Sequence, residues 1–242
     1  MTEKIYLVSL GCDKNLVDSE IMLGLLSKEG YAITNELSEA DYAIVNSCCF
    51  IGDAKEESIN TIIEIGELKK EGKLKGLIVT GCLAQRYQSM ITDELPEADA
   101  VIGTTAYDNI VSAIAEIKSK NGLADKSLYI EDLERLAGGE EHRLVPAGEV
   151  SSYIKIAEGC DRRCAYCAIP LITGKHISRP IDDILQEVHE LVAQGVQEFQ
   201  IIEQELTYYG VDLYGRTHIA ELISKMADIE GVKWIRLHYA YP

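Results

Sequence analysis

Three cysteines, Cys160, Cys164 and Cys167, lie in one short loop directly after Tyr153–Ala157, an apolar run that is typical of a strand. Three thiolates from one loop form a metal-binding arrangement. A closed zinc site requires four protein ligands, and no His or further Cys lies close by in the sequence to complete one. A 4Fe-4S cluster held by three thiolates keeps one iron open to a small-molecule ligand. The loop therefore predicts an open iron-sulfur site.

The C-x3-C-x2-C spacing of this loop resembles the signature of the radical S-adenosylmethionine (AdoMet) enzymes. The resemblance implies that the three cysteines hold a 4Fe-4S cluster, that AdoMet chelates the open iron, and that the aromatic Tyr166 packs near the adenine. Two other interpretations stay open. Cys164 and Cys167 also suit a thioredoxin-type redox pair, and all three cysteines suit burial as small hydrophobic residues.

Three further cysteines, Cys12, Cys48 and Cys82, each follow a predicted strand. Open α/β sheets bind ligands at the carboxyl ends of their strands, so we expect these thiols to converge on one crevice. Each also precedes a predicted helix, whose dipole favours a thiolate. The alternative is that they are ordinary buried cysteines of a sheet core.

The segments around these three cysteines resemble the N-terminal domain of the radical-AdoMet methylthiotransferases. The matching segments are Ser9–Glu20, Asn46–Ile59 and Thr80–Tyr87. The resemblance implies that Cys12, Cys48 and Cys82 hold a second 4Fe-4S cluster. Cys49 stands where the family usually has a small residue, so we expect a bystander there, although competition with Cys48 stays open.

Other segments resemble one branch of this family, the RimO type, which adds a methylthio group to the β-carbon of an aspartate in small-subunit ribosomal protein twelve. The segments are Lys14–Glu20, Ala54–Ile59 and Tyr208–Gly215. The MiaB-type branch, which modifies an adenosine in tRNA, is the alternative, and a non-catalytic cluster- or zinc-binding fragment is a third possibility.

The resemblance also implies a mechanism and its partners. AdoMet cleavage gives a radical that removes hydrogen from the unactivated aspartate β-carbon, and the methylthio group comes from the second cluster. No ordinary side-chain base removes so weakly acidic a proton, so the cofactor carries the chemistry. The expected partners are the ribosomal protein and an electron donor such as flavodoxin or ferredoxin.

The elements that position Cys12, Cys48 and Cys82 occupy residues 1–120, where β-rich apolar runs alternate with amphipathic stretches. This alternation predicts a doubly wound α/β domain with a parallel sheet covered on both faces. The expected strands are Ile5–Leu10, Tyr31–Thr34, Tyr42–Ser47, Leu77–Thr80 and Val101–Gly103. The expected helices carry Val17, Ile21 and Leu25, then Ile59, Ile62 and Ile63, then Ile110, Ile114 and Ile117.

Residues 121–150 lose periodicity and collect Gly and acidic residues, which is typical of a linker. Residues 151–242 predict the first part of a β/α barrel, with a helix opened by Pro180, strands at Phe199–Ile202 and Trp234–His238, and a helix at Ile219–Ala227. We expect this radical-AdoMet domain to be truncated after about three strands, with the family's C-terminal TRAM domain absent. Thr173 stands where the family commonly has Arg.

The composition is that of a globular protein, with 47% hydrophobic and 26% charged residues. Seven cysteines and no signal peptide predict a cytoplasmic location, where cysteines serve metals or catalysis rather than disulfides. The net charge of -17 argues against nucleic acid as the main partner and suits a basic protein.

The remaining polar candidates are less specific. Glu203, Gln204, Glu205 and Tyr208 follow a predicted barrel strand and either contact AdoMet or substrate or form a solvated loop. The five histidines show no ligand spacing. The three in the second half, His176, His189 and His218, are expected at the surface.

Overall fold

A computed structural model describes residues 2–120, 126–136 and 143–240 of the 242-residue chain. The chain divides into two compact units, Met1–Asp132 and Leu133–Pro242. Within the described residues, no helix is long and apolar enough to cross a bilayer.

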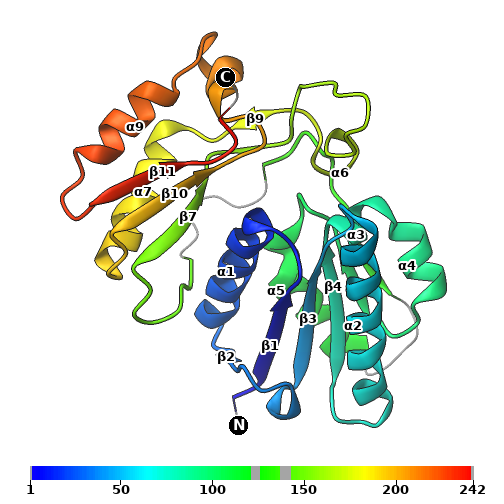
Figure 1. The fold of residues 1–242 in the computed structure, drawn as a ribbon. Coiled ribbons are helices and arrows are strands. Elements are labelled where there is room, and N and C mark those ends of the chain that lie inside the picture. Colours follow the sequence, from blue (N-terminus) through cyan, green and yellow to red (C-terminus); the bar gives the residue numbers. More distant parts are fainter. Residues whose placement is uncertain (1, 121–125, 137–142, 241–242) are drawn as a thin grey trace. The chain divides into compact units, whose positions relative to one another are not determined.

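The first unit is built on one parallel sheet of order β2-β1-β3-β4-β5-β6 (Figure 1). Every residue of β3 and β4 is buried, as expected for central strands covered on both faces. The strand order reverses between β1 and β3, which makes their carboxyl ends the topological switch point where such sheets bind ligands. The strands are β1 Lys4–Ser9, β2 Ala32–Ile33, β3 Tyr42–Ser47, β4 Gly76–Gly81, β5 Ala100–Ile102 and β6 Ser127–Tyr129.

Helices lie on both faces of this sheet (Figure 1). Helix α1 packs against α5, and α2 packs against β3 and β4. The α-helices of the unit are α1 Asp13–Lys28, α2 Gly52–Lys70, α3 Cys82–Arg86, α4 Gln88–Glu94 and α5 Ile110–Lys120. Two 3-10 turns accompany them, at Leu37–Glu39 and Tyr107–Asn109. The predicted doubly wound α/β class is confirmed.

The second unit alternates strands and helices around a parallel sheet of order β11-β10-β7 (Figure 1). Its core contains Ile184, Val188 and Leu191, which form an apolar stripe on α7, the helix that was expected to begin at Pro180. A short antiparallel pair, β8 and β9, flanks the loop between β7 and α7. The elements are β7 Ser151–Lys155, β8 Ala157–Glu158, α6 Pro170–Thr173, β9 Ile177–Ser178, α7 Ile181–Ala193, β10 Glu198–Ile202, a 3-10 turn Leu206–Tyr208, α8 Val211–Tyr214, α9 Ile219–Ala227 and β11 Trp234–Leu237.

The stretch 121–150, which we expected to be a linker, contributes a strand to the first sheet. β6 pairs with β5 through Ser127, Leu128 and Tyr129. Three residues are too few to show a strand's alternation in the sequence. These residues form a strand because they pair in parallel with the edge strand β5.

Candidate metal centres

The predicted ligands of the first unit, Cys12, Cys48 and Cys82, gather at the carboxyl edge of its sheet. Cys12 follows β1 and caps the N-terminus of α1, Cys48 follows β3, and Cys82 follows β4 as the first residue of α3. These are three adjacent strands of the sheet, and two of them form the switch point. The convergence that the sequence predicted therefore has a structural basis in the strand order.

A buried amide lies between the thiols of this group. Asn15 Oδ1 accepts a hydrogen bond from Cys12 Sγ at 3.5 Å and a long one from Cys82 Sγ at 3.9 Å. Its Nδ2 donates to Asn46 Oδ1 at 2.8 Å, and Asn46 Nδ2 donates back to the Asn15 carbonyl at 2.8 Å and to Ser19 Oγ at 2.9 Å. This network joins the first turn of α1 to the end of β3 and fixes the places of both thiols.

Burial affects the acidity of the thiols of Cys12, Cys49 and Cys82. Burial raises the pKa of Cys82, and the nearby thiols of Cys49, Cys12 and Cys48 raise it further. Burial likewise raises the pKa of Cys12 and of Cys49. Desolvation is the largest cause of the raised pKa of Cys82, and it acts against the effect of a helix N-terminus, which favours a thiolate. Binding of a metal would have to release these protons.

Cys49 is part of the same group rather than remote from it. Cys49 is buried, with 5% of its surface exposed. Its thiol interacts with those of Cys48 and Cys82 and with the Arg86 guanidinium. Four thiols, not three, therefore lie at this edge.

The predicted ligands of the second unit, Cys160, Cys164 and Cys167, lie in the loop that follows β7 and β8. Cys160 is buried, Cys167 is partly buried and Cys164 is exposed. Burial raises the pKa of Cys160, as do the neighbouring Cys167, Glu205 and Cys164. The loop starts at Gly159, whose φ of +69° and close approach to the Lys175 carbonyl exclude a side chain, since a Cβ would lie 1.9 Å from that oxygen.

Polar contacts hold this loop against the barrel strands. Arg162 Nε donates to Glu205 Oε2 at 2.7 Å, and the Asp161 carboxylate accepts from the His176 backbone N–H at 3.2 Å. The Cys160 N–H donates to the Gly174 carbonyl at 3.1 Å. Tyr166 is 93% exposed, so its predicted contact with an adenine stays a prediction.

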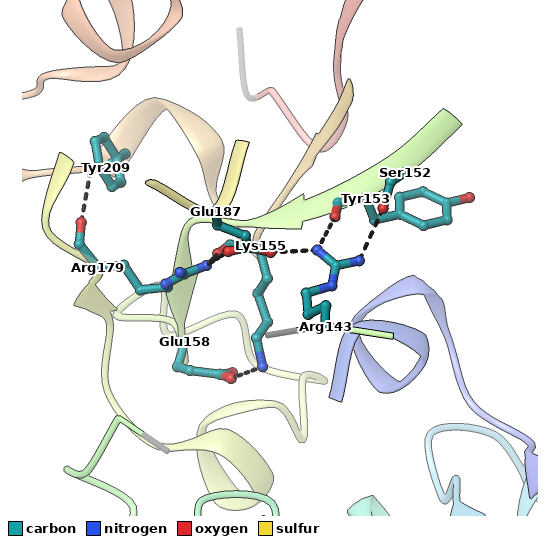
Figure 2. A network of polar contacts seen from close by, with 8 residues as sticks. All are labelled: Arg143, Ser152, Tyr153, Lys155, Glu158, Arg179, Glu187 and Tyr209. Carbon is teal, nitrogen blue, oxygen red and sulfur yellow. Dashed lines mark hydrogen bonds and ion pairs between the residues drawn. The ribbon is translucent and has the colours of Figure 1, made fainter. Parts of the chain in front are cut away.

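Figure 2 shows the network behind the cluster loop. Glu187 on α7 accepts from the guanidinium groups of Arg143 and Arg179, and Arg179 also donates to the Lys155 carbonyl at 2.7 Å. Lys155, at the end of β7, pairs with Glu158. The strand that leads into the loop is therefore fixed to α7 by buried charges. The remaining contacts drawn are Arg143 Nη1 to the Tyr153 carbonyl, Arg143 Nη2 to Ser152 Oγ, and Tyr209 Oη to the Arg179 carbonyl.

Sequence reasoning misplaced some polar residues of the second unit. His176 was expected at the surface but is buried, with 5% of its surface exposed, because Ser178 and the Tyr208 ring enclose it. The His218 side chain is also largely buried, at 11% exposed, beside the Tyr214 ring. Glu203 and Glu205 are buried rather than part of a solvated loop. Tyr208, which packs against His176, and Arg162, which pairs with Glu205, lie in other segments of the chain, so no local signal identifies the burial of these two residues.

The donor sets of both groups fit iron. The first sheet provides four thiols and the loop after β8 provides three, and thiolates are the ligand type that iron-sulfur clusters take. Within residues 2–120, 126–136 and 143–240, no three or more His, Cys, Asp or Glu side chains are drawn together in a metal-binding geometry. In the first sheet, the thiols of Cys12 and Cys82 both lie within hydrogen-bond range of Asn15 Oδ1.

Two family models match the chain. The "Uncharacterized protein family UPF0004" model matches residues 4–103, and the "Radical SAM superfamily" model matches residues 154–240. The first covers the cysteines of the first sheet, and the second covers the cysteine loop.

Curated relatives match nearly the whole chain. A "Ribosomal protein uS12 methylthiotransferase RimO" of Lachnoclostridium phytofermentans is 52% identical over 239 residues, which cover 99% of this chain and 53% of that protein. A protein of the same name from Bacteroides thetaiotaomicron is 47% identical over 242 residues, covering 99% of this chain and 52% of its own length. The chain spans about half the length of the curated relatives it matches.

Solved structures share the fold at low sequence identity. The radical S-adenosylmethionine methyltransferase TsrM of Kitasatospora setae, with cobalamin and a [4Fe-4S] cluster bound, superposes with a TM-score of 0.57 at 12% identity, over 97% of this chain and 56% of that one. The cobalamin-dependent radical enzyme OxsB gives a TM-score of 0.58 at 12% identity, over 96% and 38%. These matches concern the fold alone.

Proposed function

Because the chain belongs to the radical-AdoMet methylthiotransferase family, we propose that it functions in adding a methylthio group to an aspartate β-carbon of ribosomal protein uS12. The observation that carries the proposal is the identity of about one residue in two with proteins named RimO, which extends through both units. It favours the protein substrate over tRNA. A basic ribosomal protein also suits the net charge of -17.

In this proposal each unit holds one 4Fe-4S cluster. Cys160, Cys164 and Cys167 bind the cluster that also takes AdoMet, and three thiols of the first sheet, those of Cys12, Cys48 and Cys82, bind the other. When bound, the clusters and AdoMet supply the one-electron chemistry that side chains lack. The electron comes from a donor such as flavodoxin or ferredoxin, and the reaction takes place in the cytoplasm.

Polar residues of the chain hold and orient the cysteines that would bind the clusters. Asn15 and Asn46 hold the thiols of Cys12 and Cys82 at one edge of the sheet. In the second unit, the Arg162–Glu205 pair holds the cluster loop against the end of β10. Such supporting contacts fix the orientation of metal ligands and influence their affinity.

Iron and sulfide content after anaerobic reconstitution tests the proposal. We expect about eight irons per chain, since each 4Fe-4S cluster carries four. A triple alanine variant of Cys160, Cys164 and Cys167 is expected to retain about four, and so is the triple variant of Cys12, Cys48 and Cys82.

Two other results would contradict the proposal. If the wild type bound about four irons and lost none with the second triple variant, the thiols of the first sheet would be core residues and the methylthiotransferase function would fail. A colourless chain that bound zinc instead would indicate a non-catalytic metal-binding fragment.

A further inference from the structure

Two cations of the first unit, Lys55 near the start of α2 and Arg86 at the end of α3, meet on one aromatic ring. The Lys55 ammonium lies 4.1 Å from the centre of the Tyr87 ring, and the Arg86 guanidinium carbon lies 5.2 Å from it. A cation over an aromatic face is attracted by the ring and is thereby held in place. In the part of the chain that the structure describes, no carboxylate pairs with either cation. Their positive charge is therefore free to bind an anion from outside the chain.

Both cations lie beside the thiols of the first sheet. Burial is the largest effect on the pKa of Cys49 and raises it, whereas Arg86 and Lys55 act in the opposite direction, so both charges are close to this thiol. Cys49 in turn interacts with Cys48 and Cys82, two of the three predicted ligands. The cation pair therefore belongs to the same edge of the sheet as the predicted metal centre.

The surface next to this pair is open to a macromolecule. Phe50 and Ile51, just before α2, expose 61% and 57% of their surface. Arg86 is exposed, and Lys55 and Tyr87 are partly exposed. Exposed apolar side chains that gather next to charged ones are typical of a surface that contacts another protein. An anion carried by a protein can therefore reach the cation pair.

The proposed reaction brings such an anion to this edge. An aspartate β-carbon has to reach the thiols of the first sheet, where the resemblance implies the source of the methylthio group. The aspartate carboxylate is bonded directly to this carbon and so arrives with it. Cysteines bind metals as thiolates, and like charges repel strongly where water is excluded. A cation beside the thiols offsets this repulsion. Lys14 also lies near Cys12, but it pairs with Asp13.

We propose that Lys55 and Arg86 form a carboxylate-binding site that receives the side chain of the substrate aspartate beside the thiols of the first sheet. The inference rests on the proposed function, which provides the aspartate. Lys55 supplies a point charge, and the planar fork of donors on Arg86 matches the geometry of a carboxylate. Such a site selects aspartate over asparagine, which has the same shape but no charge to pair with the two cations.

A double-mutant cycle between this site and the substrate tests the inference. Lys55→Met and Arg86→Gln each remove one positive charge from the chain, and uS12 with its target aspartate replaced by asparagine lacks the negative charge. Lys28→Met is the matched control, because Lys28 is an exposed lysine in the last turn of α1, at the opposite end of that helix from Cys12. The readout is the equilibrium affinity of the cluster-loaded chain for each form of uS12, measured by fluorescence anisotropy.

We expect Lys55→Met to weaken binding of wild-type uS12 about tenfold, and Arg86→Gln about threefold, since an exposed charge pair contributes less than a partly buried one. Both variants should bind the asparagine form as the wild-type chain does. Arg86→Lys, which keeps the charge, should bind wild-type uS12 more tightly than Arg86→Gln. Lys28→Met should leave the ratio of the two affinities unchanged.

Two results would overturn the inference. An equal loss of affinity for both forms of uS12 would show that the cations support the fold or the surface without binding the carboxylate. An unchanged ratio of affinities, together with a lowered reduction potential of the cluster in the first unit, would show that the cations act on the cluster instead.

The wild-type chain separates this inference from the proposed function. If it loads both clusters and binds uS12, but the cycle shows no coupling between the cations and the aspartate, the inference is rejected and the function stands. If it loads no iron at Cys12, Cys48 and Cys82, or does not bind uS12, the function is rejected and the inference with it.

Discussion

At the scale of single residues, a glycine lets the end of β4 lie close to the amide network beside the thiols of the first sheet. Gly81 precedes Cys82 and has a φ of +89°, which residues with a Cβ rarely adopt. A Cβ there would lie 2.4 Å from Asn46 Oδ1 and 2.5 Å from the Ser47 carbonyl oxygen. The absence of a side chain lets β4 turn into α3 against the amide network that holds Cys12 and Cys82.

Substitution of Gly81 by Ala tests this point, with Gly72→Ala as its matched control. Gly72 has a similar φ of +75°, but a Cβ there would meet no atom within 4 Å. Gly72→Ala should lower the free energy of unfolding by the backbone strain alone, about 1–2 kcal/mol. Gly81→Ala should cost at least twice as much in urea unfolding and should reduce the iron bound by the first unit. Equal losses in the two variants would show that the contacts with Asn46 and Ser47 do not matter.

At the scale of elements, the cluster loop depends on how β7 is joined to α7. Glu187 on α7 joins the two elements, since it pairs with both Arg143 and Arg179 (Figure 2). Its side chain is only 11% exposed. Burial alone would raise the pKa of Glu187, but the two guanidinium groups outweigh it, so the pKa is lowered. A carboxyl group with a lowered pKa stabilises the fold above its ordinary pKa, and this contribution is lost as the pH falls through the lowered value.

Glu187→Gln should therefore destabilise the second unit in a pH-dependent way. At neutral pH we expect a loss of about 3 kcal/mol in the free energy of unfolding, because the buried guanidinium group of Arg143 and the partly buried one of Arg179 lose their counter-charge. The difference from wild type should shrink as the pH falls from the ordinary pKa of a glutamate through the lowered pKa of Glu187. Urea unfolding at several pH values measures it. The exposed Asp183→Asn on the same helix should change stability by no more than about 0.5 kcal/mol. A pH-independent difference would contradict the electrostatic origin.

At the scale of the whole molecule, charge is the property that bears on the partner. The net charge of -17 gives a field that attracts basic proteins and repels phosphate backbones. The proposed substrate, ribosomal protein uS12, belongs to the first class and tRNA to the second.

Salt dependence tests this property directly. Binding of uS12 to the chain should weaken at least several-fold between about 50 and 300 mM salt, because the Debye length falls as ionic strength rises. Anticodon-stem RNA, the control, should bind more weakly than uS12 at every salt concentration. Tighter binding of the RNA, or an affinity for uS12 that salt does not change, would contradict the proposed partner. Fluorescence anisotropy with labelled uS12 and labelled RNA makes the comparison.

The sequence by itself determined the class of fold and the positions of both cysteine groups. β3 was predicted at its observed bounds, Tyr42–Ser47, from a short β-rich apolar run, and α9 was predicted at its observed bounds, Ile219–Ala227. Cysteines that follow successive parallel strands must lie at one edge of the sheet, so the gathering of Cys12, Cys48 and Cys82 also followed from local patterns. Which of them bind iron stays a prediction.

Only the tertiary structure decided the residues that surround these thiols. Asn15 and Asn46 are 31 residues apart, Arg143 and Glu187 are 44 apart, and Ser178 and Asp212 are 34 apart. Asn15, Asn46 and Asp212 stand in segments that resemble the family, but the resemblance gives no partner for them, and polar residues such as His176 and Glu205 are by type more often exposed than buried. Their burial was decided by contacts between distant segments, which local periodicity does not encode. The ligands were therefore visible in the sequence, whereas the side chains that hold and orient them became visible only once the chain was folded.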